Sequence, residues 1–173
     1  MEILRLWFWW DEILRQKSTP IEPTEDVFYY NNVLQDMAKT ARVTDKIVWL
    51  ALPQVGILKR GFVIATKDEK KQTIGWIYIN PSYEPIWDEK NVFLEECLSE
   101  PWVRVPIERH NRIMAHYTNT KGKNIDIELS WFHARIFQHE YDHLDGILII
   151  DKYREMIYQT SIDEIKETIE TTE

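Results

Sequence analysis

The five residues 139–143, which read His-Glu-Tyr-Asp-His, constrain the fold more than any other part of the chain. They lie in a segment, 131–144, that is predicted to form a helix. Side chains four positions apart lie on one face of a helix, one turn from each other. The imidazoles of His139 and His143 can therefore reach one divalent ion at the ~2.0–2.1 Å typical of zinc–nitrogen bonds. Glu140, on the neighbouring edge of that face, can contact a water at the ion without being a ligand.

Two imidazoles do not complete a hydrolytic metal site, because such a site needs a third protein ligand and an open position. Cys97 is the only cysteine of the chain, and a thiolate is a strong ligand for Zn²⁺ or Fe²⁺. The alternative is that both histidines lie on the surface beside a solvated Glu140, and that Cys97 is a small buried apolar residue. We predict that Cys97, His139 and His143 hold the ion.

The composition fits one globular domain. The chain has 173 residues, of which 44% are hydrophobic, and a formal net charge of -8. An acidic balance argues against direct nucleic-acid binding, because phosphate binding needs clustered Lys and Arg. A single cysteine excludes a disulfide within the chain, and no stretch approaches the ~20 apolar residues of a membrane span. We expect a cytoplasmic monomer without a membrane partner.

An aromatic run near the N-terminus, residues 6–10, reads Leu-Trp-Phe-Trp-Trp and is interrupted at once by Asp11 and Glu12. It lacks the cationic start and the long apolar core of a secretory signal. We expect this run to pack on the domain, and a membrane-surface anchor is the alternative.

Three helices are predicted from capping residues and apolar spacing. Thr24 is the predicted N-cap of a first helix that ends near 44–45. Ser130 is expected to cap the helix 131–144, and Ser161 begins a capping-box pattern for a last helix. Three apolar residues are expected to pack this last helix on the domain: Ile162, Ile165 and Ile169.

The middle of the chain is rich in strand patterns. Residues 119–122 read Asn-Thr-Lys-Gly and are typical of a hairpin turn. Strands and helices do not alternate regularly, so the sequence favours an α+β fold over a doubly wound α/β fold. The predicted strands are 47–52, 62–66, 74–80, 112–118 and 124–129.

Three segments resemble sequence boxes of the peptide deformylase family. Residues 95–99, Glu-Glu-Cys-Leu-Ser, resemble its Glu-Gly-Cys-Leu-Ser box. Residues 138–146, Gln-His-Glu-Tyr-Asp-His-Leu-Asp-Gly, resemble its Gln-His-Glu-x-Asp-His-Leu-x-Gly box. Residues 47–54, Ile-Val-Trp-Leu-Ala-Leu-Pro-Gln, are similar to its Gly-x-Gly-Leu-Ala-Ala-x-Gln box. With lesser similarities, the resemblance covers about residues 4–152.

The resemblance implies a fold with antiparallel or mixed sheets around a central metal-binding helix, with an N-terminal helix and a C-terminal helix. We accordingly expect residues 1–173 to form a single catalytic domain. Its core would span about 4–152, and a helical tail would span 153–173.

The resemblance also implies an activity, the removal of the formyl group from the N-terminal formyl-methionine of nascent polypeptides. The ion would be Fe²⁺ natively, with Zn²⁺, Ni²⁺ or Co²⁺ as substitutes. Glu140 would act as general base and then as general acid, and Gln54 and the backbone N–H of Leu98 would stabilise the oxyanion. The implied partner is the nascent peptide, with the ribosome as a candidate place of encounter.

The sequence departs from the family boxes at residues that line the substrate groove. Ile47 and Trp49 replace glycines, Leu52 replaces an alanine, and Glu96 replaces the glycine before the cysteine. Glycine permits a close backbone approach that larger residues prevent. The candidate substrate-binding residues are Val48, Trp49 and Glu96. The metal and proton-transfer residues are all retained, so we hypothesise that the chemistry is kept while the substrate preference is altered.

Two other functions remain open at this point. A metallopeptidase would use the same histidine pair, usually with Glu or Asp as the third ligand. A non-catalytic binding protein on the same scaffold would explain the altered groove, although it would not need Glu140 or Gln54. A purely structural role is the least favoured, because it would require none of these residues in this order.

Overall fold

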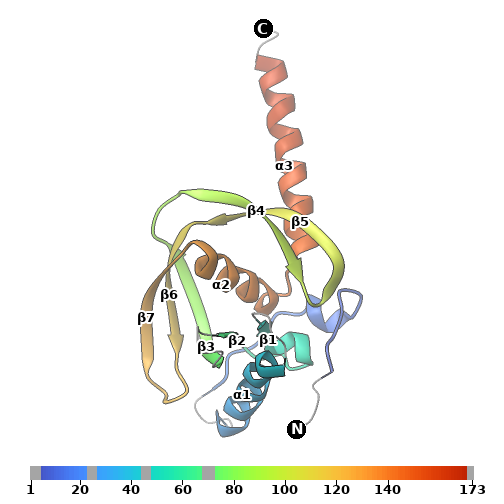
Figure 1. The fold of residues 1–173 in the computed structure, drawn as a ribbon. Helices are drawn as coiled ribbons and strands as arrows, with labels where there is room; N and C mark the ends of the chain where they lie inside the picture. The colour runs from blue at the N-terminus through green and yellow to red at the C-terminus, as the bar shows by residue number, and fades with distance from the viewer. Residues whose placement is uncertain (1–4, 23–26, 44–47, 68–72, 171–173) are drawn as a thin grey trace.

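The computed structural model describes residues 5–22, 27–43, 48–67 and 73–170 (Figure 1). Its helical elements, with η for a 3-10 helix, are η1 (Glu12–Arg15), α1 (Val27–Val43), η2 (Leu52–Val55), α2 (Trp131–Leu144) and α3 (Ile149–Glu170). Its strands are β1 (Val48–Ala51), β2 (Gly61–Lys67), β3 (Thr73–Pro85), β4 (Lys90–Cys97), β5 (Glu100–His110), β6 (Arg112–Thr118) and β7 (Asn124–Ser130).

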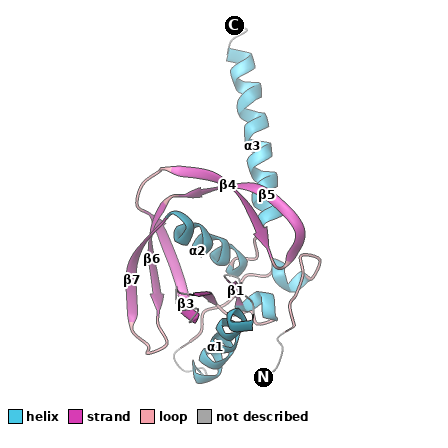
Figure 2. Cartoon of the chain, in the orientation of Figure 1, coloured by secondary structure: helices cyan, strands magenta, loops and turns pink. Residues whose placement is uncertain are grey.

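The strands form two antiparallel sheets on either side of α2 (Figure 2). One sheet has the order β1-β2-β3-β6-β7, and the other pairs β4 with β5. Helix α1 packs mainly on β2 and β3. Figure 1 shows α2 in the middle of the molecule, with strands on both sides of it and α1 below. The predicted α+β fold with a central helix, one helix before it and one after it, is confirmed.

Helix α2 is buried on two opposite faces, which fixes its orientation. On one face the Phe137 ring packs edge-on against Phe62 of β2 and Tyr78 of β3, with centroids 5.0 and 5.2 Å away. Fully burying a phenylalanine side chain contributes about 1.5–3 kcal/mol. The other face carries Arg135 and His139, four residues apart, and both form polar contacts with β4. The apolar face therefore holds the helix while the polar face presents its side chains to the second sheet.

The β6–β7 hairpin confirms the two strands predicted at 112–118 and 124–129, with β7 one residue longer. Its turn is closed by the N–H of Asn119, which donates to the Lys123 carbonyl at 2.9 Å. Gly122 has a φ of 73°, which a residue with a side chain adopts at a cost. This explains the glycine in the predicted turn.

Other predicted elements differ from the structure. Strand β3 extends five residues beyond the predicted strand 74–80, to Pro85, and β4 and β5 were not predicted. Ser130 is at the N-cap position of α2, but its side chain makes no capping hydrogen bond. The predicted cap Thr24, the predicted helix end at 44–45 and Ile47 lie outside the described residues.

The predicted start of the last helix at Ser161 is wrong, because α3 begins twelve residues earlier, at Ile149. The side chain of Glu100, the first residue of β5, accepts the N–H groups of Ile149 and Ile150 at 3.0 and 3.2 Å. Glu100 is only 1% exposed, so this cap is supplied from within the domain. Capping from another element leaves no local sequence signal at the helix start.

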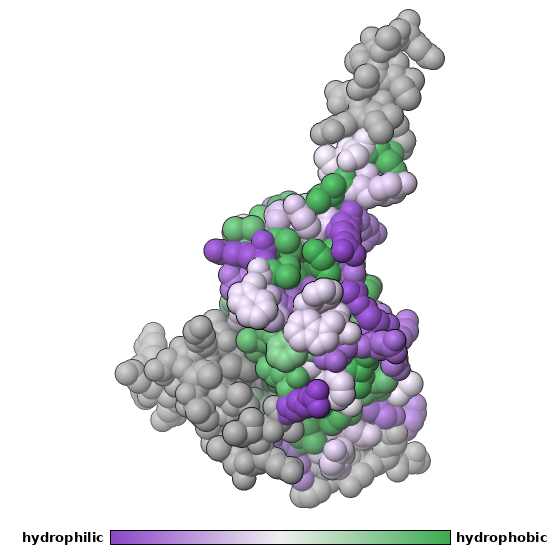
Figure 3. Space-filling view, turned by 90° about the vertical axis from the view of Figure 1, so that its right-hand side faces the viewer, coloured by the Kyte–Doolittle hydropathy of each residue, from purple (hydrophilic) through white to green (hydrophobic). Residues whose placement is uncertain are grey.

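Helix α3 packs its first turns mainly on β5, and Figure 1 shows it extending away from the sheets beyond that point. Ile157 and Tyr158 are 46% and 70% exposed, whereas Ile162, one of the three isoleucines expected to pack on the domain, is half-buried. The side chains of Ile165 and Ile169 lie outside the described residues. In Figure 3, apolar and hydrophilic side chains are mixed over the face below α3. Within the described residues, none of the helices has the length and apolar character needed to cross a membrane.

Candidate metal centre

The fold brings Cys97 to the histidine pair. Cys97 ends β4, while His139 and His143 lie one turn apart on α2. Each offers a ligand atom, and these atoms all lie within 4.8 Å of one another. The Sγ of Cys97 lies 3.3 Å from the Nε2 of His143. All three residues are buried. A sulfur and two imidazole nitrogens that converge in this way form a donor set suited to a divalent transition metal.

His139 is oriented by a carboxylate behind it. Its Nδ1 is 3.0 Å from the Oε2 of Glu95, on β4. Its Nε2 is buried and has no hydrogen-bond partner. Buried polar atoms nearly always have a partner, and metal-binding histidines usually donate their other ring N–H to a carboxylate. The geometry of His139 therefore fits that of a metal ligand that would bind through Nε2.

The two imidazoles differ in their electrostatic surroundings. Burial lowers the pKa of His139, but the neighbouring Cys97 sulfur and Glu95 carboxylate outweigh it and raise this pKa well above its ordinary value. Burial, together with the positive charges of His139 and Arg109, holds the pKa of His143 well below its ordinary value. His143 is thus neutral at pH 7, the form in which an imidazole binds a metal.

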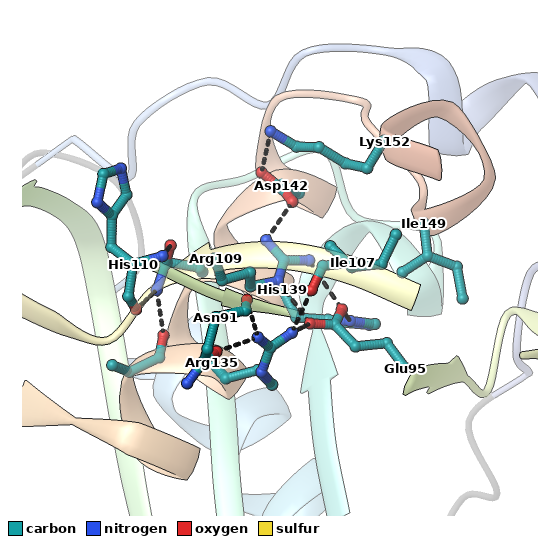
Figure 4. Close-up of polar contacts among 12 residues, drawn as sticks. Asn91, Glu95, Ile107, Arg109, His110, Arg135, His139, Asp142, Ile149 and Lys152 are labelled. Atoms are coloured by element: carbon teal, nitrogen blue, oxygen red, sulfur yellow. Dashed lines mark hydrogen bonds and ion pairs between the residues drawn. The ribbon is translucent and has the colours of Figure 1, made fainter. Parts of the chain in front are cut away.

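Glu95 is the centre of a buried ionic network (Figure 4). Arg109 of β5 donates to its two oxygens at 2.7 and 2.9 Å, and Arg135 of α2 donates to it at 2.5 Å. Burial alone would raise the pKa of Glu95, but hydrogen bonds from His139 and Arg109 and the charge of Arg109 hold it well below its ordinary value. Glu95 is therefore a carboxylate at neutral pH. Glu95 is the first residue of the segment 95–99 that resembles a family box, but the sequence did not indicate its role.

The same network ties α2 to both strands of the smaller sheet. Arg109 also donates to Asp142 at 2.7 Å, and Arg135 donates to the Asn91 carbonyl at 2.9 Å (Figure 4). Arg109 and Asp142 are almost inaccessible to solvent, at 4% and 7% exposure. Buried charges are tolerated only when they are paired and hydrogen-bonded, as these are. The helix face that carries His139 is thereby fixed relative to the end of β4 that carries Cys97.

Glu140 is the most deeply buried acid of the site. It is fully buried, and neither carboxylate oxygen has a hydrogen-bond partner. Its Oε1 is 3.8 Å from the Nε2 of His139. Burial raises the pKa of Glu140 to about 7, against the lowering effect of the positive charges on His139 and Arg109. Glu140 can therefore both accept and donate a proton near neutral pH.

Gln54, in η2, also lies close to the cysteine. Its Oε1 accepts the backbone N–H of Ala51 at 2.7 Å, which directs the amide nitrogen inward. That nitrogen donates to the Ser99 Oγ at 3.0 Å and is 3.7 Å from the Cys97 Sγ. Leu98, which is 52% exposed, and Ser99 form the turn between β4 and β5. The Gln54 amide thus lies beside Cys97, and Leu98 follows Cys97 directly in the chain.

A pocket of about 230 Å³ opens beside His139. Two predicted substrate-binding residues, Trp49 and Glu96, line it, and Glu96 forms an ion pair with Arg104 at 3.2 Å. Val48 pairs with Ala65 in the sheet, and its side chain lies outside the described residues. The pocket lining is completed by residues that the sequence did not indicate: Leu94, Glu95, Arg104, Phe132, Arg135 and Ile136.

Known proteins resemble this chain over most of its length. The family model described as Polypeptide deformylase matches residues 3–158. A peptide deformylase from Thermotoga maritima is 39% identical over 142 residues, which is 82% of each chain. Peptide deformylase 2 from Clostridium acetobutylicum is 38% identical over 147 residues, 85% of this chain and 93% of its own.

Solved structures agree with these sequence matches. A probable peptide deformylase from the Synechococcus phage S-SSM7 has a TM-score of 0.79 and 33% identity, over 87% of this chain and 100% of its own. The crystal structure of the Thermotoga maritima peptide deformylase has a TM-score of 0.75 and 37% identity, over 88% of this chain and 98% of its own. The match of the family model, the identities and the shared fold together show that this chain belongs to the peptide deformylase family.

Proposed function

We propose that this protein hydrolyses the N-terminal formyl group of formyl-methionine on nascent polypeptides, releasing formate and a free amine. The observation that carries the proposal is the convergence of the Cys97 Sγ on the imidazoles of His139 and His143, beside a buried Glu140. Relatives named peptide deformylase, such as one that is 39% identical, support the same reaction.

Cys97, His139 and His143 are the proposed metal ligands. The fit rests on the donor set and on the buried, unpartnered Nε2 of His139. A divalent ion held there supplies a Lewis acid for the formyl oxygen and lowers the pKa of a water molecule. We propose Fe²⁺ as the native ion, with Zn²⁺, Ni²⁺ or Co²⁺ as substitutes, because one thiolate and two imidazoles suit all of them.

Glu140 is the proposed general base and acid. It takes a proton from the attacking water and returns it to the nitrogen of the leaving amine, so that the proton balance closes within one turnover. Its pKa of about 7 suits both steps. Its complete burial excludes bulk water from the carboxylate that carries the proton.

Gln54 and the backbone N–H of Leu98 are the proposed oxyanion donors. As the formyl carbon becomes tetrahedral, negative charge develops on its oxygen. The Gln54 amide is fixed from two sides, by Ala51 and by Ser99, and therefore needs little reorganisation to meet that charge. The loss of one such donor typically costs about 2.7–4 kcal/mol of transition-state stabilisation.

The pocket beside His139 is the proposed binding site of the methionine side chain. Trp49 and Phe132 form an edge-to-face pair in its wall, with ring centroids 6.1 Å apart. A thioether makes favourable contacts with aromatic rings, and an unbranched side chain fits a pocket of this size. We propose that Val48, Trp49 and Glu96 contact the substrate, and that the bulk of Trp49 alters the preference for the first side chain.

The two alternatives are less well supported. A metallopeptidase with this histidine pair would usually complete its site with a carboxylate, whereas the third donor here is the Cys97 sulfur. A non-catalytic binding protein would have no use for Glu140, whose burial without a hydrogen-bond partner is costly. Retention of Glu140 and Gln54 therefore favours catalysis.

The test is the turnover of formyl-methionyl peptides by protein prepared without oxygen and loaded with Fe²⁺ or Ni²⁺. The matched control is Glu140→Ala, prepared and loaded in the same way, with the metal content measured on each sample. We expect formate release by the wild type and a rate at least about 100-fold lower for the control. Equal rates at equal metal content would refute the proposed function.

Three finer expectations stay predictions. They are encounter with the substrate at the ribosome, a monomeric state, and a single catalytic domain with its core at about 4–152 and its tail at 153–173.

A further inference from the structure

We propose that the N-terminal aromatic run, residues 6–10, positions the two oxyanion donors, and that the backbone N–H of Trp9 is the decisive contact. The inference rests on the proposed function, because it concerns the roles assigned to Gln54 and Leu98. From the sequence, this run was expected only to pack on the domain. Trp9 would be a positioning residue, because it acts through Ser99 and does not touch the substrate.

The run connects two segments of the site that are distant in the sequence. The N–H of Trp7 donates to the Gln54 carbonyl at 2.9 Å, and the N–H of Trp9 donates to the Ser99 carbonyl at 2.9 Å. Gln54 and Ser99 are also joined directly, since the Gln54 amide donates to the Ser99 Oγ at 3.0 Å. The three segments thus form a closed ring of hydrogen bonds around the donors beside Cys97.

The run is itself held in place. Its end is a tight turn in which the N–H of Asp11 donates to the Phe8 carbonyl, and the N–H of Phe8 donates to the Asp11 carboxylate, both at 2.8 Å. At its other end, the Trp7 indole packs against Gly56, the C-cap of η2. A Cβ at position 56 would lie 2.6 Å from the Trp7 Nε1, so only glycine fits without displacement.

The side chain and the backbone of Trp9 have different environments. Trp9 is 46% exposed, so its indole does not pack in the core. The N–H donates to Ser99, which is fully buried in the turn that also contains Leu98. Oxyanion donors accelerate a reaction only when they are fixed before the charge develops, and a misplacement of about 1 Å can cost up to ~100-fold in rate. The backbone contact is therefore the functional one.

The decisive experiment compares Trp9→Pro with Trp9→Ala in the full-length, metal-loaded protein. Trp9 is the second residue of the turn from Phe8 to Asp11, a position where proline is favoured. Proline deletes the N–H and keeps the turn, whereas alanine deletes the indole and keeps the N–H. We expect Trp9→Ala to match the wild type. We expect Trp9→Pro to lower kcat per bound metal ion about tenfold, with KM within about twofold.

Equal kcat in the two variants would overturn the proposal, and so would a loss that appears only in KM. If Trp9→Pro does not fold, Trp7→Ala and Trp7→Phe replace it. The alanine variant removes the indole that packs on Gly56 and should lower kcat several-fold, while the phenylalanine variant should restore most of it. Equal kcat in this pair would also overturn the proposal.

A second readout does not depend on turnover. The side-chain amide protons of Gln54, which is 1% exposed, can be followed by NMR hydrogen exchange. We expect faster exchange in Trp9→Pro than in Trp9→Ala, because the Ser99 acceptor is no longer held. Equal exchange would contradict the positioning role. If the wild-type protein does not deformylate peptides, the proposed function is refuted. The positioning role of Trp9 is still tested in that case, because the exchange comparison does not depend on turnover.

Discussion

Glu95 and His139 are joined by a 3.0 Å contact between a carboxylate oxygen and the Nδ1 of the imidazole, and this contact connects strand β4 to helix α2. The same strand ends two residues later in Cys97, so one carboxylate sets the spacing between the sulfur and the imidazole pair. Because Arg109 and Arg135 also bind this carboxylate, Glu95 both orients the His139 imidazole and balances buried positive charge.

We predict that Glu95→Gln weakens metal binding about 10- to 100-fold, because the amide no longer fixes the His139 tautomer as a carboxylate does. It should also lower the free energy of unfolding by about 3–5 kcal/mol, since Arg109 and Arg135 lose a buried partner. Metal titration and urea denaturation measure the two effects. The matched control is Glu96→Gln, the exposed neighbour on the same strand, which should change both quantities little. Similar effects of the two substitutions would show that Glu95 has no special role.

We predict that Glu100 makes the free energy of unfolding depend on pH. Burial raises the pKa of Glu100 above its ordinary value, although the N–H groups of Ile149 and Ile150 lower it. A carboxyl whose pKa is higher in the folded state binds its proton more tightly there. Its contribution to stability is therefore complete below the unfolded-state pKa of about 4.3, and it is lost as the pH rises through the raised pKa.

Glu100→Gln removes this titration and keeps an acceptor for the helix end. The free energy of unfolding of the wild type, minus that of Glu100→Gln, should therefore fall as the pH is raised from about 4 and become constant above the raised pKa. Urea denaturation at a series of pH values, with equal metal content, measures this difference. A difference that does not vary with pH would contradict the assigned environment of Glu100.

We predict that Trp49 narrows the pocket for the first substrate side chain. Trp49→Ala removes the ring that faces Phe132 and should enlarge the pocket. The ratio of kcat/KM for formyl-methionyl over formyl-phenylalanyl peptides should then fall about tenfold, since a pocket discriminates side chains by size within this range. Trp87→Ala, a change at a tryptophan that is 58% exposed and does not line the pocket, is the control. An unchanged ratio in Trp49→Ala would remove Trp49 from the specificity site.

The sequence predicted those strands and helices that are marked by the spacing of their own apolar residues and by their own turn residues. Strands β6 and β7 alternate in polarity around a turn with glycine, and α2 has helical spacing. Strand β4 was missed because three consecutive apolar residues, 92–94, are exposed and break the alternation that marks a strand. Helix α3 was predicted to begin too late because its cap, Glu100, comes from a distant strand.

The sequence singled out Cys97, His139 and His143, which converge in the structure, together with Glu140, but it did not indicate the residues that orient them. Glu95 and Asp142 bind partners 14 and 33 positions away, and propensity does not indicate such long-range pairs. One usable signal was present: residues two apart in a strand share a face, so Glu95 had to lie on the same side as Cys97. Had β4 been recognised as a strand, a carboxylate beside the histidine pair could have been predicted.

The most direct test of this account is the absorption spectrum of the Co²⁺-loaded protein, because a cobalt–thiolate bond gives an intense near-ultraviolet charge-transfer band. We expect one ion per chain and this band in the wild type and in Glu140→Ala. Cys97→Ser should lose the band and bind the ion much more weakly. A Cys97→Ser protein that keeps both the band and the affinity would contradict the claim that Cys97, His139 and His143 together hold the metal.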